Sequence, residues 1–246
     1  MFAIIGGSGL AKLTALESPR RQIMRTPYGE PSGALTFGRL ASTDVVFLAR
    51  HGYGHTLAPH EINYRANIWA LKELQVEGVI SVATVGGIRA DLGPGMLVLP
   101  HQIIDYTHSR KSTFFEGSEV PVIHADFTIP YSPPLRADLL AAAARCGEPL
   151  VDGGVYACTQ GPRLETAAEI ERIAREGGDM VGMTGMPEAV LAREAELAYA
   201  TIGVVVNHAA GRGTSMEAIL LQELDRVMSV TVTRAVRILM AFFGRA

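Results

Sequence analysis

The 246-residue sequence has only two cysteines and no long hydrophobic run, and each absence excludes a class of protein. Cys146 and Cys158 have neither the spacing of a metal site nor the density of a secreted disulfide scaffold, so we expect two reduced, structural thiols. No segment approaches the roughly 20 uncharged apolar residues that span a membrane, and no basic segment leads into an apolar run at the N-terminus. We therefore expect a cytoplasmic protein with no membrane partner.

Blocks of like charge are also missing. The formal net charge is -3, and the 22 basic and 25 acidic residues are dispersed along the chain. Because this distribution lacks the basic patch that binds nucleic acid, we expect small molecules as partners and no nucleic acid. Hydrophobic residues make up 48% of the sequence, enough for one large core, and no linker or repeat divides the chain. We predict a single domain over residues 1–246.

Apolar runs alternate with segments of helical periodicity along the chain. They predict strands at 2–5, 44–49, 78–83, 96–99, 102–105, 154–158, 180–183 and 200–206, and helices at 64–74, 135–145, 166–175, 188–196 and 217–243. The last helix is expected to bend at its β-branched residues 230–233. Such alternation predicts an α/β fold with a central mixed, largely parallel sheet flanked by helices. The irregular stretch 108–134 is long enough to be functional or at an interface.

A glycine-rich loop, Gly6 to Gly9, follows the first predicted strand. Its backbone N–H groups and the Ser8 hydroxyl can donate hydrogen bonds to a phosphate. Lys12 stands where a dinucleotide-binding fingerprint has its third glycine, so the motif gives little support for a dinucleotide cofactor. On this motif alone, a plain tight turn explains the glycines equally well.

Other side chains that bind oxyanions follow other predicted strands. Arg50 and His51 come directly after the second strand, with His55 four residues further on. A guanidinium at this place can grip a phosphate through two parallel hydrogen bonds, and an imidazole can orient it. Thr84 and Thr184 follow two more strands. Each residue alone reads as an ordinary loop residue, but ligands of α/β sheets bind at the carboxyl ends of strands, so their convergence predicts an anion site.

Three segments carry the groups that a 6-oxopurine requires. Glu165 lies on a Gly-Pro turn, Thr184 precedes a predicted helix, and Asn207 ends an apolar strand. A carboxylate accepts from the ring N–H of a 6-oxopurine, and an amide donates to its N7 and O6. Other roles stay open, since Glu165 can interact with a helix dipole, Asn207 can form a turn and Met183 can fill the core.

Five motifs, in order along the chain, carry a family resemblance. They are residues 4–10 (IIGGSGL), 48–52 (LARHG), 63–72 (NYRANIWALK), 159–166 (TQGPRLET) and 181–189 (VGMTGMPEA). The chain resembles, essentially from end to end, the purine nucleoside phosphorylase and methylthioadenosine phosphorylase superfamily. Within it, the chain is most similar to the bacterial enzymes that cleave S-methyl-5'-thioinosine. The resemblance implies a homotrimeric α/β enzyme that splits purine nucleosides with inorganic phosphate as co-substrate and needs no metal or organic cofactor.

Carried over residue by residue, the resemblance implies a phosphate site, a ribose contact and a base site. Met183 would lie along the ribose. Glu165 and Asn207 would bind the base, with Asn207 as the catalytic residue that donates to the departing purine. The implied phosphate site comprises Ser8, Arg50, His51, His55, Ala83, Thr84 and Thr184.

The base residues depart from the adenine-specific branch of the family. That branch has a small hydroxyl residue at the position of Glu165 and aspartates at the positions of Asn207 and Ala209. The residues found here resemble the 6-oxopurine pattern instead. Adenine has no proton on N1 and would leave the Glu165 carboxylate facing a lone pair.

At the 5' end of the nucleoside, the hydroxyl-specific members place a histidine on the last long helix, where this chain has Ile219, Leu220 and Leu221. Apolar side chains favour a thioether. His124 resembles a residue that the family contributes from a neighbouring subunit to cover that end.

Together these positions predict phosphorolysis of S-methyl-5'-thioinosine to hypoxanthine and 5-methylthioribose 1-phosphate, a purine-salvage reaction. One alternative is a phosphorylase whose substrate is methylthioadenosine, inosine or guanosine. Another is a non-catalytic nucleotide-binding module of the same layout, which would show no dependence on phosphate.

Overall fold

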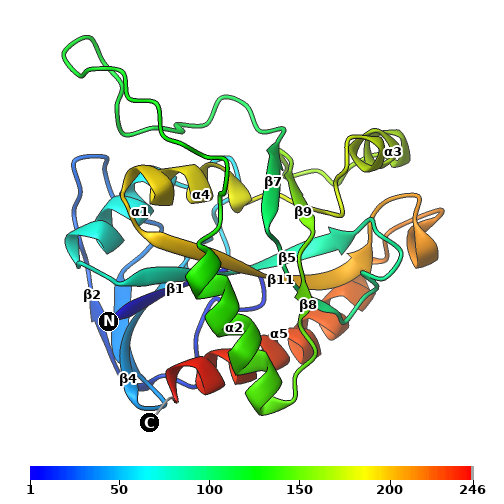
Figure 1. Cartoon of the computed structure of the whole chain (residues 1–246), viewed down its shortest axis with the longest axis horizontal. Coiled ribbons are helices and arrows are strands. Elements are labelled where there is room, and N and C mark those ends of the chain that lie inside the picture. The colour runs from blue at the N-terminus through cyan, green and yellow to red at the C-terminus, as the bar shows by residue number, and fades with distance from the viewer. Residues whose placement is uncertain (245–246) are drawn as a thin grey trace.

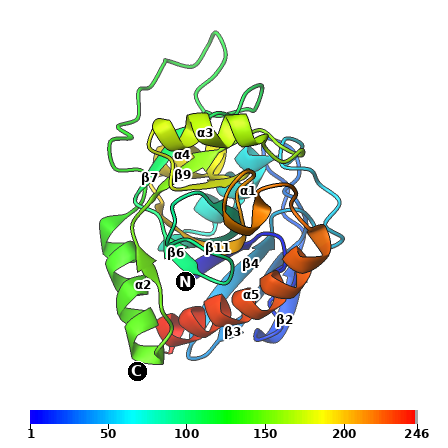
Figure 2. The same ribbon diagram turned by 90° about the vertical axis from the view of Figure 1, so that its right-hand side faces the viewer.

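The computed structural model describes residues 1–244 and confirms the predicted fold class, a mixed sheet with helices on both faces (Figure 1, Figure 2). Residues 245–246 of the expected domain lie outside this description. The α-helices are α1 (Tyr64–Glu73), α2 (Pro133–Cys146), α3 (Ala167–Arg175), α4 (Gly185–Glu194) and α5 (Leu221–Phe243). The strands are β1 (Phe2–Gly6), β2 (Glu17–Gln22), β3 (Leu35–Leu40), β4 (Thr43–Ala49), β5 (Gly78–Gly87), β6 (Leu97–Leu99), β7 (Gln102–Asp105), β8 (Val151–Asp152), β9 (Val155–Cys158), β10 (Met180–Gly182) and β11 (Ala198–His208).

β5 is the central strand of the sheet. β11 runs parallel to it along its whole length, and the opposite edge pairs first with β1, in parallel, and then with β10, antiparallel. β4 continues the parallel part beyond β1, and β3 and β2 follow in antiparallel order. From the same edge of β5, β10 leads on to β9 and β7, and these three strands are parallel to one another. β6 pairs antiparallel with β11 and parallel with β8. The sheet is therefore mixed, with its buried centre mostly parallel.

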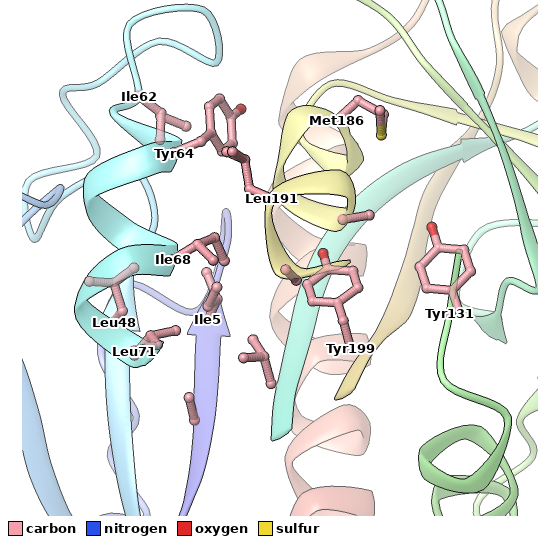
Figure 3. Packing of buried hydrophobic residues seen from close by; sticks show 14 of the residues in the cluster. Ile5, Leu48, Ile62, Tyr64, Ile68, Leu71, Tyr131, Met186, Leu191 and Tyr199 are labelled. Carbon is pink, nitrogen blue, oxygen red and sulfur yellow. The ribbon is translucent and has the colours of Figure 1, made fainter. Parts of the chain in front are cut away.

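Successive side chains of the buried strands point to opposite faces of the sheet and feed two cores. Ile5 of β1 and Leu48 of β4 lie on the face that α1 and α4 cover (Figure 3). Ile4 and Phe47, one residue earlier on the same strands, pack on the other face with residues of α2 and α5. Because both faces are buried, these strands read as continuous apolar runs rather than as an alternating pattern.

Side-chain caps begin three of the helices close to their predicted starts. The Asn63 side chain accepts from the N–H of Ala66 at the start of α1, and Ser132 caps α2 just before a proline. Thr166 and Glu169 form a reciprocal capping box on α3. These caps satisfy backbone N–H groups that the first helical turn leaves without partners.

The prediction misses β2, β3 and β8 and ends β5 too early. β2 is an exposed, charged edge strand and β8 has two residues, so neither carries a hydrophobic signal. In β3, Gly38 interrupts the apolar pattern. β5 continues to Gly87 rather than ending at Ala83, so Thr84 lies within the strand instead of after it.

The last helix also differs from its prediction. α5 begins at Leu221 rather than at 217, after a 3-10 turn at Gly213–Ser215, and it is one continuous helix through 230–233. The expected bend therefore does not interrupt the helix. The hydroxyls of Thr231 and Thr233 donate to backbone carbonyls one turn earlier, a bond that keeps the residues within the helix and often bends it. Within residues 1–244, neither α5 nor another helix combines the length and hydropathy needed to cross a bilayer.

The irregular stretch predicted at 108–134 is present between β7 and α2. Residues 106–132 have no helix or strand, and part of the segment projects away from the body of the protein in both views (Figure 1, Figure 2). Val122 and Ile123 are exposed there, 78% and 49% respectively. We call residues 106–132 the long loop.

Candidate active site

A gap in strand pairing along one edge of β5 forms the floor of a pocket. β1 pairs with β5 as far as Val82, and β10 joins the same edge only at Gly86. Between these points, Ala83, Thr84 and Val85 have no strand partner on this edge within the described chain, and all three line the pocket. Because β10 is antiparallel to β5, its C-terminal end points back toward the ends of β1 and β4. Strand ends that are distant in sequence therefore meet around one pocket.

The loop from Gly6 to Gly9 forms one wall of this pocket. The Gly7 N–H donates to the carbonyl of Val82 at 3.0 Å, which holds the loop against β5. A Cβ on Gly7 would lie 2.7 Å from Nη1 of Arg50 and 2.8 Å from the Val82 oxygen, so only glycine allows this approach. The loop is thus both a tight turn and part of the pocket, which Gly7 and Ser8 line.

Arg50 is fully buried, and most N–H groups of its guanidinium donate hydrogen bonds to other groups of the protein. Its Nε and Nη2 donate to the two oxygens of Glu188, at 2.6 and 2.8 Å. Nη2 also donates to the Ser81 hydroxyl, and Nη1 donates to the Val82 carbonyl. The predicted two-pronged grip on phosphate is therefore wrong, because a carboxylate occupies the forked face. Of the five N–H groups, one on Nη1 has no partner within residues 1–244 and is left for a ligand.

Glu188 anchors this ion pair from the first part of α4. It is 0% exposed and also accepts from the Tyr199 hydroxyl at 2.7 Å, which in turn accepts from Thr201. Burial by itself disfavours the Arg50 cation, but the Glu188 carboxylate outweighs it and raises the pKa of Arg50 above its ordinary value. Arg50 is consequently a fixed cation at neutral pH.

His51 is held as a neutral imidazole. Its Nδ1 lies 2.8 Å from the Leu57 carbonyl, and because a carbonyl only accepts, Nδ1 carries the proton. Burial, followed by the Arg50 charge, lowers the pKa of His51 to about 4. Its Nε2 therefore keeps a lone pair that can accept from a protonated phosphate oxygen. His55 lies next to Ser8, with its Nε2 3.2 Å from Ser8 Oγ.

Glu165 lies just before α3 and faces the pocket. The helix N-terminus is already capped by Thr166 and Glu169, so the role of Glu165 as a helix-dipole partner is not needed. Its Oε1 instead accepts from the Thr159 hydroxyl at 2.6 Å. This bond orients the carboxylate, whose remaining acceptor positions are available to a ring N–H.

A β-bulge aims Asn207 at the pocket. The register of β11 on β5 shifts between Val205 and Asn207, which turns the strand at this point. Asn207 and Ala209 then line the pocket together. One N–H of Asn207 Nδ2 donates to the His208 carbonyl at 2.6 Å, and the second has no partner within the described residues. Asn207 can thus offer one N–H to a base, not two.

Met183 and Thr184 line the pocket where β10 leads into α4. Thr184 is the N-cap residue of α4, but its side chain makes no capping hydrogen bond and instead interacts with the Tyr156 hydroxyl. Met183 packs against Gly161, which has φ +62°, and a Cβ there would lie 2.5 Å from the sulfur of Met183. A larger residue at 161 would displace the methionine.

The pocket brings together most of the residues singled out in the sequence. Ten of them line it: Ser8, Arg50, His51, Ala83, Thr84, Glu165, Met183, Thr184, Asn207 and Ala209. His55 stands behind Ser8. Within residues 1–244, no group of three or more His, Cys, Asp or Glu side chains is arranged to hold a metal ion.

Three predicted contacts are not made in this chain's own pocket. Leu220 and Leu221 are 59% and 65% exposed, because α5 starts at Leu221 and its first turn faces outward, and Ile219 lines the pocket instead. His124 lies exposed on the long loop.

The sequence analysis assigned no role to Glu188. The signal available was a single charged residue in the apolar motif at 181–189, which indicates a buried ion pair.

The family model of the phosphorylase superfamily matches residues 1–244. The chain belongs to the phosphorylase superfamily. This superfamily member is 52% identical over 228 residues to a probable S-methyl-5'-thioinosine phosphorylase of Pseudomonas syringae pv. tomato, covering 93% of this chain and 92% of the relative. It is 51% identical over 215 residues to a 6-oxopurine nucleoside phosphorylase of Pyrococcus furiosus, covering 85% and 80%.

Among solved structures, the superfamily member matches a methylthioadenosine phosphorylase from Schistosoma mansoni in complex with adenine. The TM-score is 0.93 at 30% sequence identity, covering 99% of this chain and 90% of the other. A methylthioadenosine phosphorylase from an antarctic soil metagenomic library matches with a TM-score of 0.91 at 37% identity, covering 98% and 84%. The fold is therefore that of these enzymes along almost the whole chain.

Replacing Glu188 tests the buried ion pair. We expect Glu188→Gln to lower the free energy of unfolding by about 3 kcal/mol or more, because it leaves the Arg50 cation buried without a counter-charge. Urea denaturation at pH 7 measures the change. Glu17→Gln, in the exposed pair with Arg39, is the control and should cost less than about 1 kcal/mol. Equal effects of the two substitutions would contradict the role given to Glu188.

The neutral state of His51 predicts a pH dependence of stability. Its pKa lies near 4 in the folded chain and near 6.5 in the unfolded chain, so between these values the unfolded chain binds more protons. This contribution to stability is present above pH 6.5 and is lost as pH falls toward 4, by about 2 to 3 kcal/mol. His51→Asn should flatten the pH profile of urea unfolding over this window, whereas His60→Asn, at an exposed site, should leave it unchanged. A profile for His51→Asn as steep as that of the parent would contradict the neutral imidazole.

Proposed function

We propose that this chain cleaves S-methyl-5'-thioinosine by phosphorolysis and releases hypoxanthine and 5-methylthioribose 1-phosphate, as a step of purine salvage. The observation that carries the proposal is a single pocket that combines oxyanion-binding groups, the pair Glu165 and Asn207, and the apolar side chain of Ile219. Relatives about half identical to this chain are named for S-methyl-5'-thioinosine and for 6-oxopurine nucleosides. Each part of the pocket is evidence for one part of the proposed substrate.

The base side of the pocket favours a 6-oxopurine. Glu165 is already oriented by the Thr159 hydroxyl, so its carboxylate is fixed to accept from N1–H. The free N–H of Asn207 can donate to N7. Adenine has a lone pair on N1, which would leave the Glu165 carboxylate without a donor. Ala209 offers no carboxylate to an exocyclic amine.

The 5' side favours a thioether over a hydroxyl. Ile219 is the residue of the segment 219–221 that lines the pocket, and it has no polar atom to pair with a 5'-OH. A hydroxyl buried against it would lose its hydrogen bonds to water, whereas a methylthio group would gain apolar contact. This contact supports methylthioinosine rather than inosine as the preferred substrate.

The phosphate would bind over the unpaired edge of β5. The free N–H of Arg50, the hydroxyls of Ser8, Thr84 and Thr184, and the backbone at Ala83 can donate to it, while Nε2 of His51 can accept from its O–H. These groups would hold one phosphate oxygen near C1' of the sugar.

In the proposed reaction, the C1'–N9 bond breaks with its electron pair going to the purine, and a C1'–O bond forms to the phosphate. The proton of the hydrogen phosphate ends on the purine, which is released as neutral hypoxanthine. Negative charge develops on the purine ring as it leaves, and it strengthens the bond from the Asn207 N–H to N7. Glu165 holds the ring through N1–H throughout. A glycosyl group is transferred without any change in oxidation state, so we propose that no metal or organic cofactor takes part.

We also propose the homotrimer that the family resemblance implies. The exposed Val122 and Ile123 on the long loop support it, since a neighbouring subunit would remove them from water. In such an assembly the adjacent His124 would reach the 5' end of a neighbour's nucleoside.

Release of free base from three nucleosides, each with and without phosphate, tests the proposed substrate. We expect phosphate-dependent cleavage of methylthioinosine, with methylthioadenosine cleaved on the order of 10⁴-fold less efficiently and inosine roughly tenfold less. Preference for inosine would favour the second candidate, a 6-oxopurine nucleoside phosphorylase, which the Pyrococcus furiosus relative supports. Preference for methylthioadenosine would overturn the assignment of Glu165 and Asn207. Base release independent of phosphate would overturn phosphorolysis itself.

Substitution of Asn207 tests its role in the departure of the base. Asn207→Ala should lower kcat by roughly 100-fold and raise KM much less, because the N–H bond strengthens as charge develops on the purine. Steady-state kinetics with methylthioinosine measure both. Gln222→Ala, an exposed amide at the start of α5, is the control and should retain parental kinetics. An unchanged kcat for Asn207→Ala would remove Asn207 from the chemistry.

A further inference from the structure

Arg110 is a half-buried cation that lies on the long loop and outside the pocket lining. Its guanidinium reaches into the body of the protein and makes hydrogen bonds with all three nitrogens. Nε donates to Gln160 Oε1 (3.1 Å), and Nη2 donates to the carbonyls of Thr159 (3.3 Å) and Gln160 (2.7 Å). The two hydrogens of Nη1 are shared among the Tyr64 hydroxyl (3.2 Å) and the carbonyls of Met183 (2.9 Å) and Met186 (2.6 Å).

Every one of these acceptors is neutral, and four of them are backbone carbonyls. A surface arginine more commonly pairs with a carboxylate, as Arg65 does with Glu116 in the same region. Arg110 also lies over the ring of Tyr64, with its Cζ 5.6 Å from the ring centroid. The planar guanidinium has N–H donors on three nitrogens, so it can donate to carbonyls of two separate segments at once, which no other side chain can do.

The two segments that Arg110 joins follow the paired strands β9 and β10 and carry different parts of the candidate active site. On one side it holds Thr159, whose hydroxyl orients the Glu165 carboxylate at 2.6 Å. On the other it holds the carbonyl of Met183, which lines the pocket next to Thr184. The Thr159 N–H also donates to the Gly182 carbonyl, so the two segments are in direct contact at this point.

We propose that Arg110 is a positioning residue, which sets the spacing between the base-binding carboxylate and the ribose-facing segment and couples both to the long loop. This proposal rests on the proposed phosphorolysis and deepens it. The β9–β10 ladder and the hydrogen bonds from Thr159 to the Gly182 carbonyl join the two segments at one end. Without the guanidinium, the carbonyls beyond that point, at 160 and 183–186, lose their common donor, which loosens the spacing between Glu165 and Met183. A displacement of about 1 Å at such a site costs on the order of 100-fold in rate.

Arg110→Lys and Arg110→Ala test the proposal, with Arg65→Ala as the matched control. Arg65 also ties the long loop to the body of the protein, through the Thr113 carbonyl and Glu116, but it does not contact 159–160 or 183–186. We expect both Arg110 variants to lose on the order of 100-fold in kcat/KM for methylthioinosine, with an unchanged KM for phosphate. Added guanidinium ion should restore part of the activity of Arg110→Ala. The control Arg65→Ala should retain the parental KM values for methylthioinosine and for phosphate. Arg110→Lys keeps the charge and most of the volume, so it remains informative if Arg110→Ala does not fold.

Hydrogen exchange provides a readout that does not depend on activity. Backbone amides of 159–166 and 183–187 should exchange faster in Arg110→Lys than in the parent or in Arg65→Ala. Two results would overturn the positioning role. One is amide exchange in these segments at the rate of the parent. The other is a loss of activity that changes the kinetic parameters for the nucleoside and for phosphate equally and that guanidinium ion does not rescue. If the parent cleaves no nucleoside with phosphate, the proposed function fails, while the exchange experiment still decides whether Arg110 holds the two segments together.

Discussion

The buried ion pair between Arg50 and Glu188 is the interaction on which the site depends. It joins the end of β4 to α4, and its further hydrogen bonds reach Ser81 on β5 and Tyr199 on β11. Removing two charges from water costs several kcal/mol per ion unless partners satisfy both groups, and here each oxygen of Glu188 and most N–H groups of Arg50 are paired. The end of β4, β5, β11 and α4 are consequently held in one relative position beside the pocket.

Under the proposed phosphorolysis, this pairing also affects how the pocket would bind phosphate. Glu188 compensates the charge of Arg50, and the low pKa of His51 keeps that ring neutral. A phosphate would therefore meet directed donors and one acceptor rather than a concentrated positive charge. In the proposed reaction, such donors would orient the phosphate for attack rather than only hold it. The Arg110 hydrogen bonds extend the same principle to the other side of the pocket, where a cation fixes backbone carbonyls instead of binding a ligand.

Overall sequence similarity does not separate two kinds of relative, because a methylthioinosine phosphorylase and a 6-oxopurine nucleoside phosphorylase are 52% and 51% identical to this chain. Both names imply a 6-oxopurine, which agrees with Glu165 and Asn207. The difference between such substrates lies at the 5' end, where Ile219 is the apolar residue of segment 219–221 that lines the pocket. Under the proposed function, the choice between these substrates depends on few side chains, Ile219 among them.

The sequence by itself determined the α/β class and most of the pocket, because strand and helix periodicities are local and because functional side chains at strand ends converge in any such sheet. Ser8, Arg50, Glu165 and Asn207 could all be named in this way. Only the tertiary structure decided what each can do. Arg50 and Glu188 are 138 residues apart in sequence, so no local pattern reveals that the carboxylate takes the forked face of the guanidinium. The gap on the edge of β5, the bulge before Asn207 and the place of Ile219 rather than Leu221 likewise depend on how distant strands pair and where a helix starts, which packing of the whole chain settles.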